Sequence, residues 1–162
     1  MTEDNTNRRP AARASVAWRI AFSVMYRILR LADPVVRSGV ANGLPGLDGV
    51  VRISVVGRQT GRPRRTLVTL LRVDRSWYVG HPNGDTGWTR NAESAGWLEI
   101  DPPSAGGPRR TVTRLPDGPE RTAVIRATWK QQPFPANLLY RAAARHIAAV
   151  GVYFRLEPVT DA

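Results

Sequence analysis

The sequence contains no cysteine and only two histidines, His81 and His146, among its 162 residues. The absence of cysteine excludes disulfide bonds, thiolate nucleophiles and cysteine-based metal sites. Two histidines that lie far apart in the sequence also exclude a histidine-rich zinc site. A carboxylate-only metal site is not excluded, but no cluster of acidic residues suggests one. We therefore predict a functional site without a metal.

Lysine and acidic residues are also scarce. The 24 basic residues include a single lysine, Lys130, and they outnumber the 13 acidic residues, which gives a formal net charge of +11 and a pI near 11.5. Such an excess predicts an anionic partner, which could be nucleic acid, an acidic membrane surface or an anionic small molecule. The length suits one domain with a real hydrophobic core.

Long apolar runs are missing as well. The most apolar stretch, residues 11–31, is interrupted by arginines, so it predicts neither a transmembrane span nor a signal peptide. Its spacing predicts an amphipathic helix with Trp18 and Phe22 on an apolar arc of roughly 200° and Arg19 and Arg27 on the other side. Either the helix anchors the protein at a membrane surface, or it packs on the protein's own barrel. We expect a cytoplasmic protein, able to lie peripherally on the inner face of the plasma membrane.

The chain divides into three segments by composition. Residues 1–10 are polar and predict a disordered tail, residues 11–37 hold the basic helix, and residues 38–162 form the main domain. Short β-branched runs between turn residues predict about six strands in hairpin order within that domain. They cover residues 50–56, 66–73, 77–79, 97–100, 109–115 and 150–156, and helices are expected at 88–95, 117–130 and 136–149. This order predicts an α+β fold, an antiparallel β-barrel with helices packed outside.

The turn between the first two predicted strands carries the most distinctive motif. Its sequence is Gly57-Arg58-Gln59-Thr60-Gly61-Arg62-Pro63-Arg64-Arg65-Thr66, with four arginines and no acid. Guanidinium groups held together repel one another, and their forked donors suit phosphate and carboxylate groups. The hairpin therefore predicts an anion-binding site, with a solvated, charged hairpin tip as the alternative.

Motifs for self-sufficient catalysis are missing. The sequence shows no nucleophile–base pair, no paired carboxylates, no P-loop and no dinucleotide-binding glycine fingerprint. A second glycine-rich stretch, Gly80–Gly87, would let backbone N–H groups approach a ligand closely. A chain short of acid–base groups and rich in anion-binding groups fits a protein in which a bound cofactor does the chemistry.

Taken in order, the two glycine-containing motifs resemble those of deazaflavin-dependent nitroreductase-type proteins. That family belongs to the flavin/deazaflavin oxidoreductase superfamily of split β-barrels and is abundant in actinobacteria. Residues 57–67 are similar to its GRKSGKPRxTPL hairpin, and residues 80–91 are similar to its GG…P.WxxNL segment. Residues 150–159 are similar to its final strand, so the resemblance extends over residues 11–159.

The resemblance implies a split antiparallel β-barrel that passes a hydride from reduced coenzyme F420, an 8-hydroxy-5-deazaflavin, to an organic acceptor such as a quinone or a nitro compound. By motif position it implies three groups of cofactor-binding residues. These are Arg58, Thr60, Arg64 and Thr66 at the phosphate or acidic tail, Gly80, His81, Asn83 and Gly84 along the deazaflavin edge, and Trp88 and Asn91 as braces. The catalytic residues stay unknown, with His81 and Tyr140 as candidates.

Several positions depart from the family pattern, and the acceptor pocket expected before the last strand is reduced to Phe134 and Tyr140. The departures are Gln59, Leu67, His81, Thr89 and Ala92. We therefore expect cofactor binding to be retained rather than the family's substrate range. The alternatives are an FMN-binding split-barrel reductase and a non-catalytic module that binds lipid or a membrane surface. Nucleic acid ranks last because the basic turn lacks interleaved aromatic residues. The oligomeric state stays open.

Overall fold

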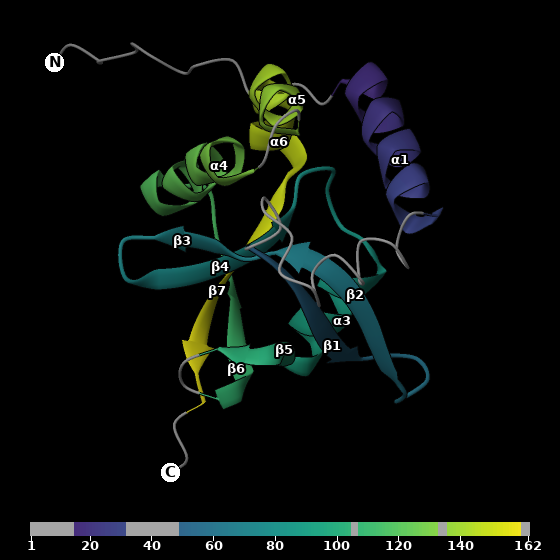
Figure 1. Cartoon of the computed structure of the whole chain (residues 1–162), viewed down its shortest axis with the longest axis vertical. Coiled ribbons are helices and arrows are strands. Elements are labelled where there is room, and N and C mark those ends of the chain that lie inside the picture. The colour runs from purple at the N-terminus through teal and green to yellow at the C-terminus, as the bar shows by residue number, and fades with distance from the viewer. Residues whose placement is uncertain (1–14, 32–48, 105–106, 133–135, 160–162) are drawn as a thin grey trace, which may run out of the picture.

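The computed structural model describes residues 15–31, 49–104, 107–132 and 136–159 (Figure 1). The predicted tail 1–10 and Phe134 lie outside these residues. The helices are α1 (Val16–Leu31), α3 (Gly87–Ala95), α4 (Pro119–Gln131), α5 (Ala136–Ala142) and α6 (Ala144–Val150). The strands are β1 (Val50–Val56), β2 (Pro63–Thr69), β3 (Leu71–Val73), β4 (Ser76–His81), β5 (Trp97–Ser104), β6 (Gly107–Arg114) and β7 (Val152–Pro158).

The seven strands form one sheet in the order β2-β1-β5-β6-β7-β4-β3, and every pairing is antiparallel. The two edge strands, β2 and β3, follow each other in the chain with only Leu70 between them. The sheet therefore has to curl until its two edges approach. This is the α+β split β-barrel that the sequence predicts. The expected strand 66–73 is two strands that break at Leu70, so the sheet has seven strands rather than about six.

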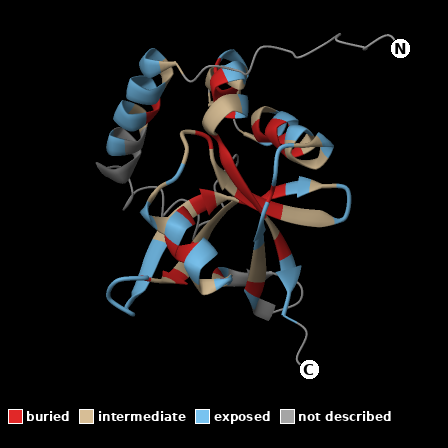
Figure 2. Cartoon of the chain, turned by 180° about the vertical axis from the view of Figure 1, so that it is seen from behind, coloured by how far each residue is buried: buried red, intermediate tan, exposed pale blue. Residues whose placement is uncertain are grey.

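Alternation along the strands creates two separate cores. Ile53, Val55 and Phe154 point into the barrel and are buried there together with side chains of β2 and β5. Tyr153, the neighbour of Phe154 in β7, points to the other face and is buried beneath the helices. Strand β7 is therefore covered on both faces, and Figure 2 shows buried residues running through the centre of the molecule. α3 adds Ala92 to the barrel core.

α1 packs against α5 and α6 at one end of the molecule (Figure 1). Phe22 is 0% exposed, with its ring 5.7 Å from that of Tyr140 and 6.0 Å from that of His146. Trp18 lies beside Phe22, at a ring distance of 6.2 Å. This side of the helix therefore packs on the protein's own body, as one of the two interpretations expected. Within the described residues, no helix is long and apolar enough to cross a bilayer.

Other elements also differ from the sequence prediction. Strand β5 continues to Ser104, four residues beyond its expected end at residue 100, and β7 begins at Val152, because Val150 belongs to α6. The expected helix 136–149 is divided at Ala143, whose φ of −84° and ψ of 7° leave the helical range before α6 begins. Strand β4 continues beyond residue 79, because Gly80 and His81 pair with Tyr153 and Val152 of β7. The first two residues of the predicted glycine-rich loop therefore belong to the sheet.

Candidate functional site

The turn between β1 and β2 is held by its own backbone. The N–H of Gly57 donates to the carbonyl of Arg62 at 2.9 Å, and the N–H of Gly61 donates to the carbonyl of Gly57 at 2.7 Å. Gly61 has a φ of +64°, which favours glycine, and a Cβ at Gly57 would lie 2.9 Å from the hydroxyl of Thr60. Thr60 therefore fills the inside of the turn, where its hydroxyl accepts the N–H of Arg62 at 3.4 Å.

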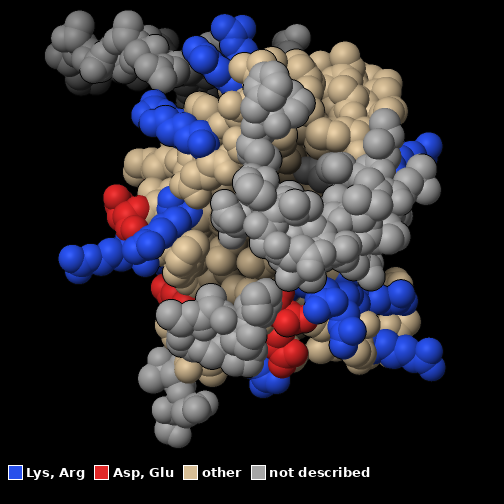
Figure 3. Space-filling model, viewed as in Figure 1, with Lys and Arg blue, Asp and Glu red and all other residues tan. Residues whose placement is uncertain are grey.

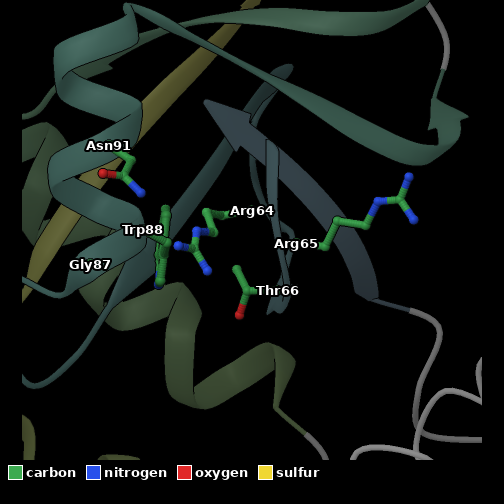
Figure 4. A pocket seen from close by; sticks show the side chains of 6 residues that line it. All are labelled: Arg64, Arg65, Thr66, Gly87, Trp88 and Asn91. Carbon is green, nitrogen blue, oxygen red and sulfur yellow. The ribbon is translucent and has the colours of Figure 1, made fainter. Parts of the chain in front are cut away.

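Strand pairing decides which hairpin side chains face α3. Arg64 pairs with Val55, and Thr66 pairs with Ile53, and both partners belong to the barrel core. Residues directly opposite in an antiparallel pair share a face, so Arg64 and Thr66 point to the inner side of the sheet. Arg65 points the other way, and Figure 4 shows its side chain leaving the site while that of Arg64 extends toward Trp88.

α3 supplies the opposite side of the site. Trp88 rests on the barrel core, with its ring 6.2 Å from that of Phe154. Asn91, one turn later and buried, accepts two hydrogen bonds on Oδ1 from Arg58, one from the backbone N–H at 3.3 Å and one from Nη1 at 3.2 Å. Asn91 therefore ties the hairpin turn to α3, and the structure brings Arg58, Arg64 and both predicted α3 residues together.

A cavity of about 240 Å³ lies between β2 and α3 (Figure 4). It is lined by Arg64, Arg65, Thr66, Gly87, Trp88 and Asn91. This lining offers a guanidinium, a hydroxyl, an aromatic face and the first turn of a helix, and none of these lining residues is acidic. Free N–H groups at a helix N-terminus favour anions, as arginine does. Beside Gly87, Thr86 Oγ1 is buried without a hydrogen-bond partner among the described residues.

The hairpin arginines lack the acidic partners that five other described arginines have. Among the described residues, Arg58, Arg62, Arg64 and Arg65 form no ion pair with any acid, and Figure 3 shows basic side chains gathered at the lower right, where the hairpin turn lies. Five arginines elsewhere in the described residues pair with acids. These are Arg52 with Asp101, Arg109 with Glu99, Arg114 with Asp85 and Glu93, Arg121 with Asp117, and Arg155 with Glu120 and Glu157.

The predicted residues at the end of β4 have structural contacts of their own. A Cβ at Gly80 would lie 2.2 Å from the Tyr153 ring, so glycine is required there by packing against β7. His81 Nδ1 lies 3.2 Å from the carbonyl oxygen of Gly84, and burial lowers the pKa of His81 to about 4. The imidazole is therefore neutral near pH 7. Gly84 has a φ of +87°, which favours glycine.

Asn83 connects α1 to α6 rather than facing the cavity. Its Nδ2 donates to the carbonyl of Arg19 at 3.2 Å, and its Oδ1 lies 3.0 Å from His146 Nε2. The N–H of Ser15 donates to His146 Nδ1 at 3.2 Å, so Nδ1 is the acceptor and Nε2–H donates to Asn83. Burial, helped by the charge of Arg19, lowers the pKa of His146 and favours this neutral form.

The two candidate catalytic residues do not line the cavity. Tyr140 is buried against Phe22 beneath α1, and His81 lies at the end of β4. Sequence reasoning also missed His146 as a partner of Asn83, because 63 residues separate the two and no local pattern links them. Among the described residues, no group of three His, Cys, Asp or Glu side chains could hold a metal ion.

No known family model and no curated protein sequence matches this chain. Among solved structures, the haem storage protein HutZ of Vibrio cholerae is similar over 70% of this chain and 83% of its own, with 15% identity and a TM-score of 0.51. A conserved hypothetical protein of Mycobacterium tuberculosis matches 96% of this chain and 87% of its own, with 12% identity and a TM-score of 0.51. An F420-H2 dependent reductase, FDR-A, covers 68% of this chain and 95% of its own, with 15% identity and a TM-score of 0.48. At these identities, the likeness concerns the fold alone.

Proposed function

We propose that this protein binds an anionic, flavin-type cofactor at the cavity between β2 and α3, and that it passes a hydride from reduced coenzyme F420 to an organic acceptor such as a quinone or a nitro compound. The observation that supports this proposal best is the position of Arg64. Its guanidinium has no acidic partner among the described residues and extends toward Trp88 in a cavity with no acidic lining residue. The split-barrel fold and the two sequence motifs agree with the same proposal.

The chemistry of the lining fits the charged part of such a cofactor. F420 carries a phosphate and an acidic glutamate tail, which suit the guanidinium of Arg64, the hydroxyl of Thr66 and the N–H groups that begin α3. Pockets that hold a whole drug-sized ligand measure roughly 300–1,000 Å³. A cavity of about 240 Å³ is smaller, so we place one charged group inside it and the rest of the cofactor along the open surface beside it.

In this proposal the chain binds and orients, and the cofactor reacts. Arg64 and Thr66 hold the anionic group, Trp88 offers a flat face, and Asn91 fixes Arg58 at the rim. Bound reduced F420 would supply the hydride for the acceptor. The proposal does not rest on four of the predicted cofactor-binding residues, because their structural contacts already explain why they are present. These are Thr60, Gly80, His81 and Asn83.

The first test is a fluorescence titration of F420 into the wild type and into the double variant Arg58→Ala/Arg64→Ala. A charged hydrogen bond is worth about 1.5–3 kcal/mol, so losing two should weaken binding by about 100-fold or more. Turnover is then followed with reduced F420 and a quinone, by the return of the oxidised coenzyme. Unchanged binding by the double variant would contradict the proposed site.

FMN is the second candidate, because it also joins a flat ring to a phosphate that Arg64 and Thr66 could hold. Titrations with FMN and with haem, run in parallel with F420, separate the ligands. Tight FMN binding without F420 binding would support the anion-binding site, with FMN as the cofactor in place of F420. If the double variant still binds haem, then haem binds outside the proposed site. If none of the three binds, the oxidoreductase proposal is wrong.

A further inference from the structure

The end of the molecule formed by α1, α5 and α6, called here the helical end, exposes most of the large apolar side chains that reach solvent. Among the described residues, Val16, Ile20 and Val24 of α1 are 72%, 59% and 50% exposed, and Leu138 of α5 is 55% exposed. Of the side chains whose exposure is described, one further large apolar residue, Val159, is strongly exposed, at 37%. The helical end therefore differs from the rest of the surface.

The exposed residues of α1 form a stripe. Val16, Ile20 and Val24 are four residues apart, so they lie one above the other along about 12 Å of the helix. Phe22 lies nearly opposite on the same helix and is packed inside against Tyr140. The apolar arc of the sequence thus divides into an inner face that packs on the protein and an outer edge with Ile20 and Val24, and Val16, from the arginine side of the helix, extends that edge into the stripe.

The helical end has charge of one sign. The sequences of α1, α5 and α6 contain no Asp or Glu. Their exposed arginines include Arg19, Arg27, Arg141 and Arg145. Figure 3 shows basic but no acidic side chains at the upper end of the molecule, where Figure 1 places these helices. These arginines form no ion pair with any acid in the part of the chain that the structure describes. An aliphatic stripe beside such arginines matches a surface with an apolar interior and anionic groups at its face.

We propose that the helical end lies on an anionic phospholipid bilayer, with the stripe inserted shallowly between lipids and the arginines on their phosphates. α1 has 16 residues, or about 24 Å, which is shorter than the 30 Å hydrocarbon core, so it lies in the plane of the interface. Binding needs no rearrangement of α1, because Phe22 and the Asn83–His146 contacts hold it with the stripe outward.

The same surface is poorly suited to a protein partner or a second copy. Four aliphatic side chains provide far less than the roughly 800 Å² that each partner buries in a stable protein interface. Two helical ends brought together would also oppose arginine to arginine. A bilayer needs neither a large flat patch nor acidic side chains, because anionic headgroups supply the countercharge.

The test is sedimentation of the full chain with vesicles of phosphatidylcholine alone and of phosphatidylcholine mixed with phosphatidylglycerol. We expect binding to the anionic vesicles, and we expect Ile20→Asn/Val24→Asn to weaken it at least about tenfold. Both side chains are exposed, so the fold should persist, and circular dichroism verifies it. Val159→Asn is the matched control, since it removes an exposed apolar side chain outside the helical end, and it should bind as the wild type does.

A second pair of variants tests the charges. Arg19→Gln/Arg141→Gln removes two arginines from the helical end, and Arg62→Gln/Arg75→Gln removes two from other exposed turns. The first pair should weaken binding about tenfold or more, and the second by less than about threefold. Equal losses in the two pairs, or wild-type binding by Ile20→Asn/Val24→Asn, would overturn the proposal. Concentration-dependent dimerisation without lipid, lost in that same variant, would show that a second copy occupies the stripe.

Discussion

The hairpin turn and the helical end are both rich in arginine and free of acidic residues, yet they are built differently. At the hairpin, Arg64 extends into a cavity that also offers a hydroxyl and a helix N-terminus. At the helical end, Arg19 and its neighbours flank an exposed aliphatic stripe. Both regions contribute to the net charge of +11, so the net charge does not distinguish them. What distinguishes them is the shape and chemistry next to the charge.

Other arginines show a third arrangement. Arg114 bridges Asp85 of the loop before α3 and Glu93 within α3, at 3.0 and 2.9 Å. Arg121 pairs with Asp117 and also donates to the carbonyls of Ala148 and Gly151. These guanidiniums already have partners and hold elements together. We therefore expect ligand binding at the arginines beside the cavity and beside the stripe, and not at these paired arginines.

Residues 80–84 pack against β7 and connect α1 to α6, so the largest effect on stability should come from disturbing them. We expect Gly80→Val to lower the free energy of unfolding by about 3 kcal/mol, because its Cβ would overlap the Tyr153 ring. The melting temperature should fall by roughly 6–12 °C. Gly87→Ala is the control, because a Cβ there meets no atom within 4 Å, and it should leave the melting temperature within about 2 °C. Equal shifts in the two variants would contradict this packing.

Acid should also destabilise the structure around residues 80–84. His81 has a pKa of about 4 in the folded protein, against 6.5 without the fold, because burial disfavours its charged form. The unfolded chain therefore binds more protons between these values, so stability is full above pH 6.5 and falls as the pH drops toward 4. By pH 5 the loss from this group is roughly 2 kcal/mol. Urea unfolding at pH 7 and pH 5 measures it, and His81→Gln should flatten the dependence. An unchanged slope would show that other groups cause it.

A smaller effect is expected where the hairpin meets α3. Asn91→Ala removes the acceptor of two hydrogen bonds from Arg58, which leaves the turn less tightly fixed. We expect stability to fall by about 1 kcal/mol and F420 affinity by about tenfold, with vesicle binding unchanged. Thermal unfolding, F420 titration and vesicle sedimentation on one preparation separate the two regions. A parallel loss of vesicle binding would show that the regions are coupled.

The smallest effect should come from an arginine that already has partners. Arg109 pairs with Glu99 at 3.1 Å and lies 4.1 Å above the Trp97 ring, on an exposed part of β6. Exposed ion pairs are worth roughly 0–1 kcal/mol, so Arg109→Gln should cost less than about 1 kcal/mol. It should bind F420 and vesicles as the wild type does. A loss of binding to either ligand would show that arginines with acidic partners also bind ligands, and the distinction between paired and unpaired arginines would be wrong.

Local sequence was sufficient for the hairpin and much of the fold. Two β-branched runs around a glycine-rich turn predict β1 and β2, and alternation along β2 separates Arg64 from Arg65. The tertiary contacts were not predictable in this way. Periodicity cannot tell which side of an amphipathic helix packs inward, so it did not separate the outward-facing Ile20 and Val24 from the buried Phe22. The break at Leu70 and the packing role of Gly80 likewise depend on strands that are distant in sequence.

The most direct test of the proposed site between β2 and α3 compares Arg64→Gln with Arg65→Gln in an equilibrium titration with F420. The two substitutions are adjacent on β2 and remove the same charge, but only Arg64 extends toward Trp88. We expect Arg64→Gln to weaken binding about 10- to 100-fold and Arg65→Gln to weaken it less than about threefold. Equal losses would mean that the hairpin attracts anions through its general charge, and the cavity between β2 and α3 would no longer be the binding site.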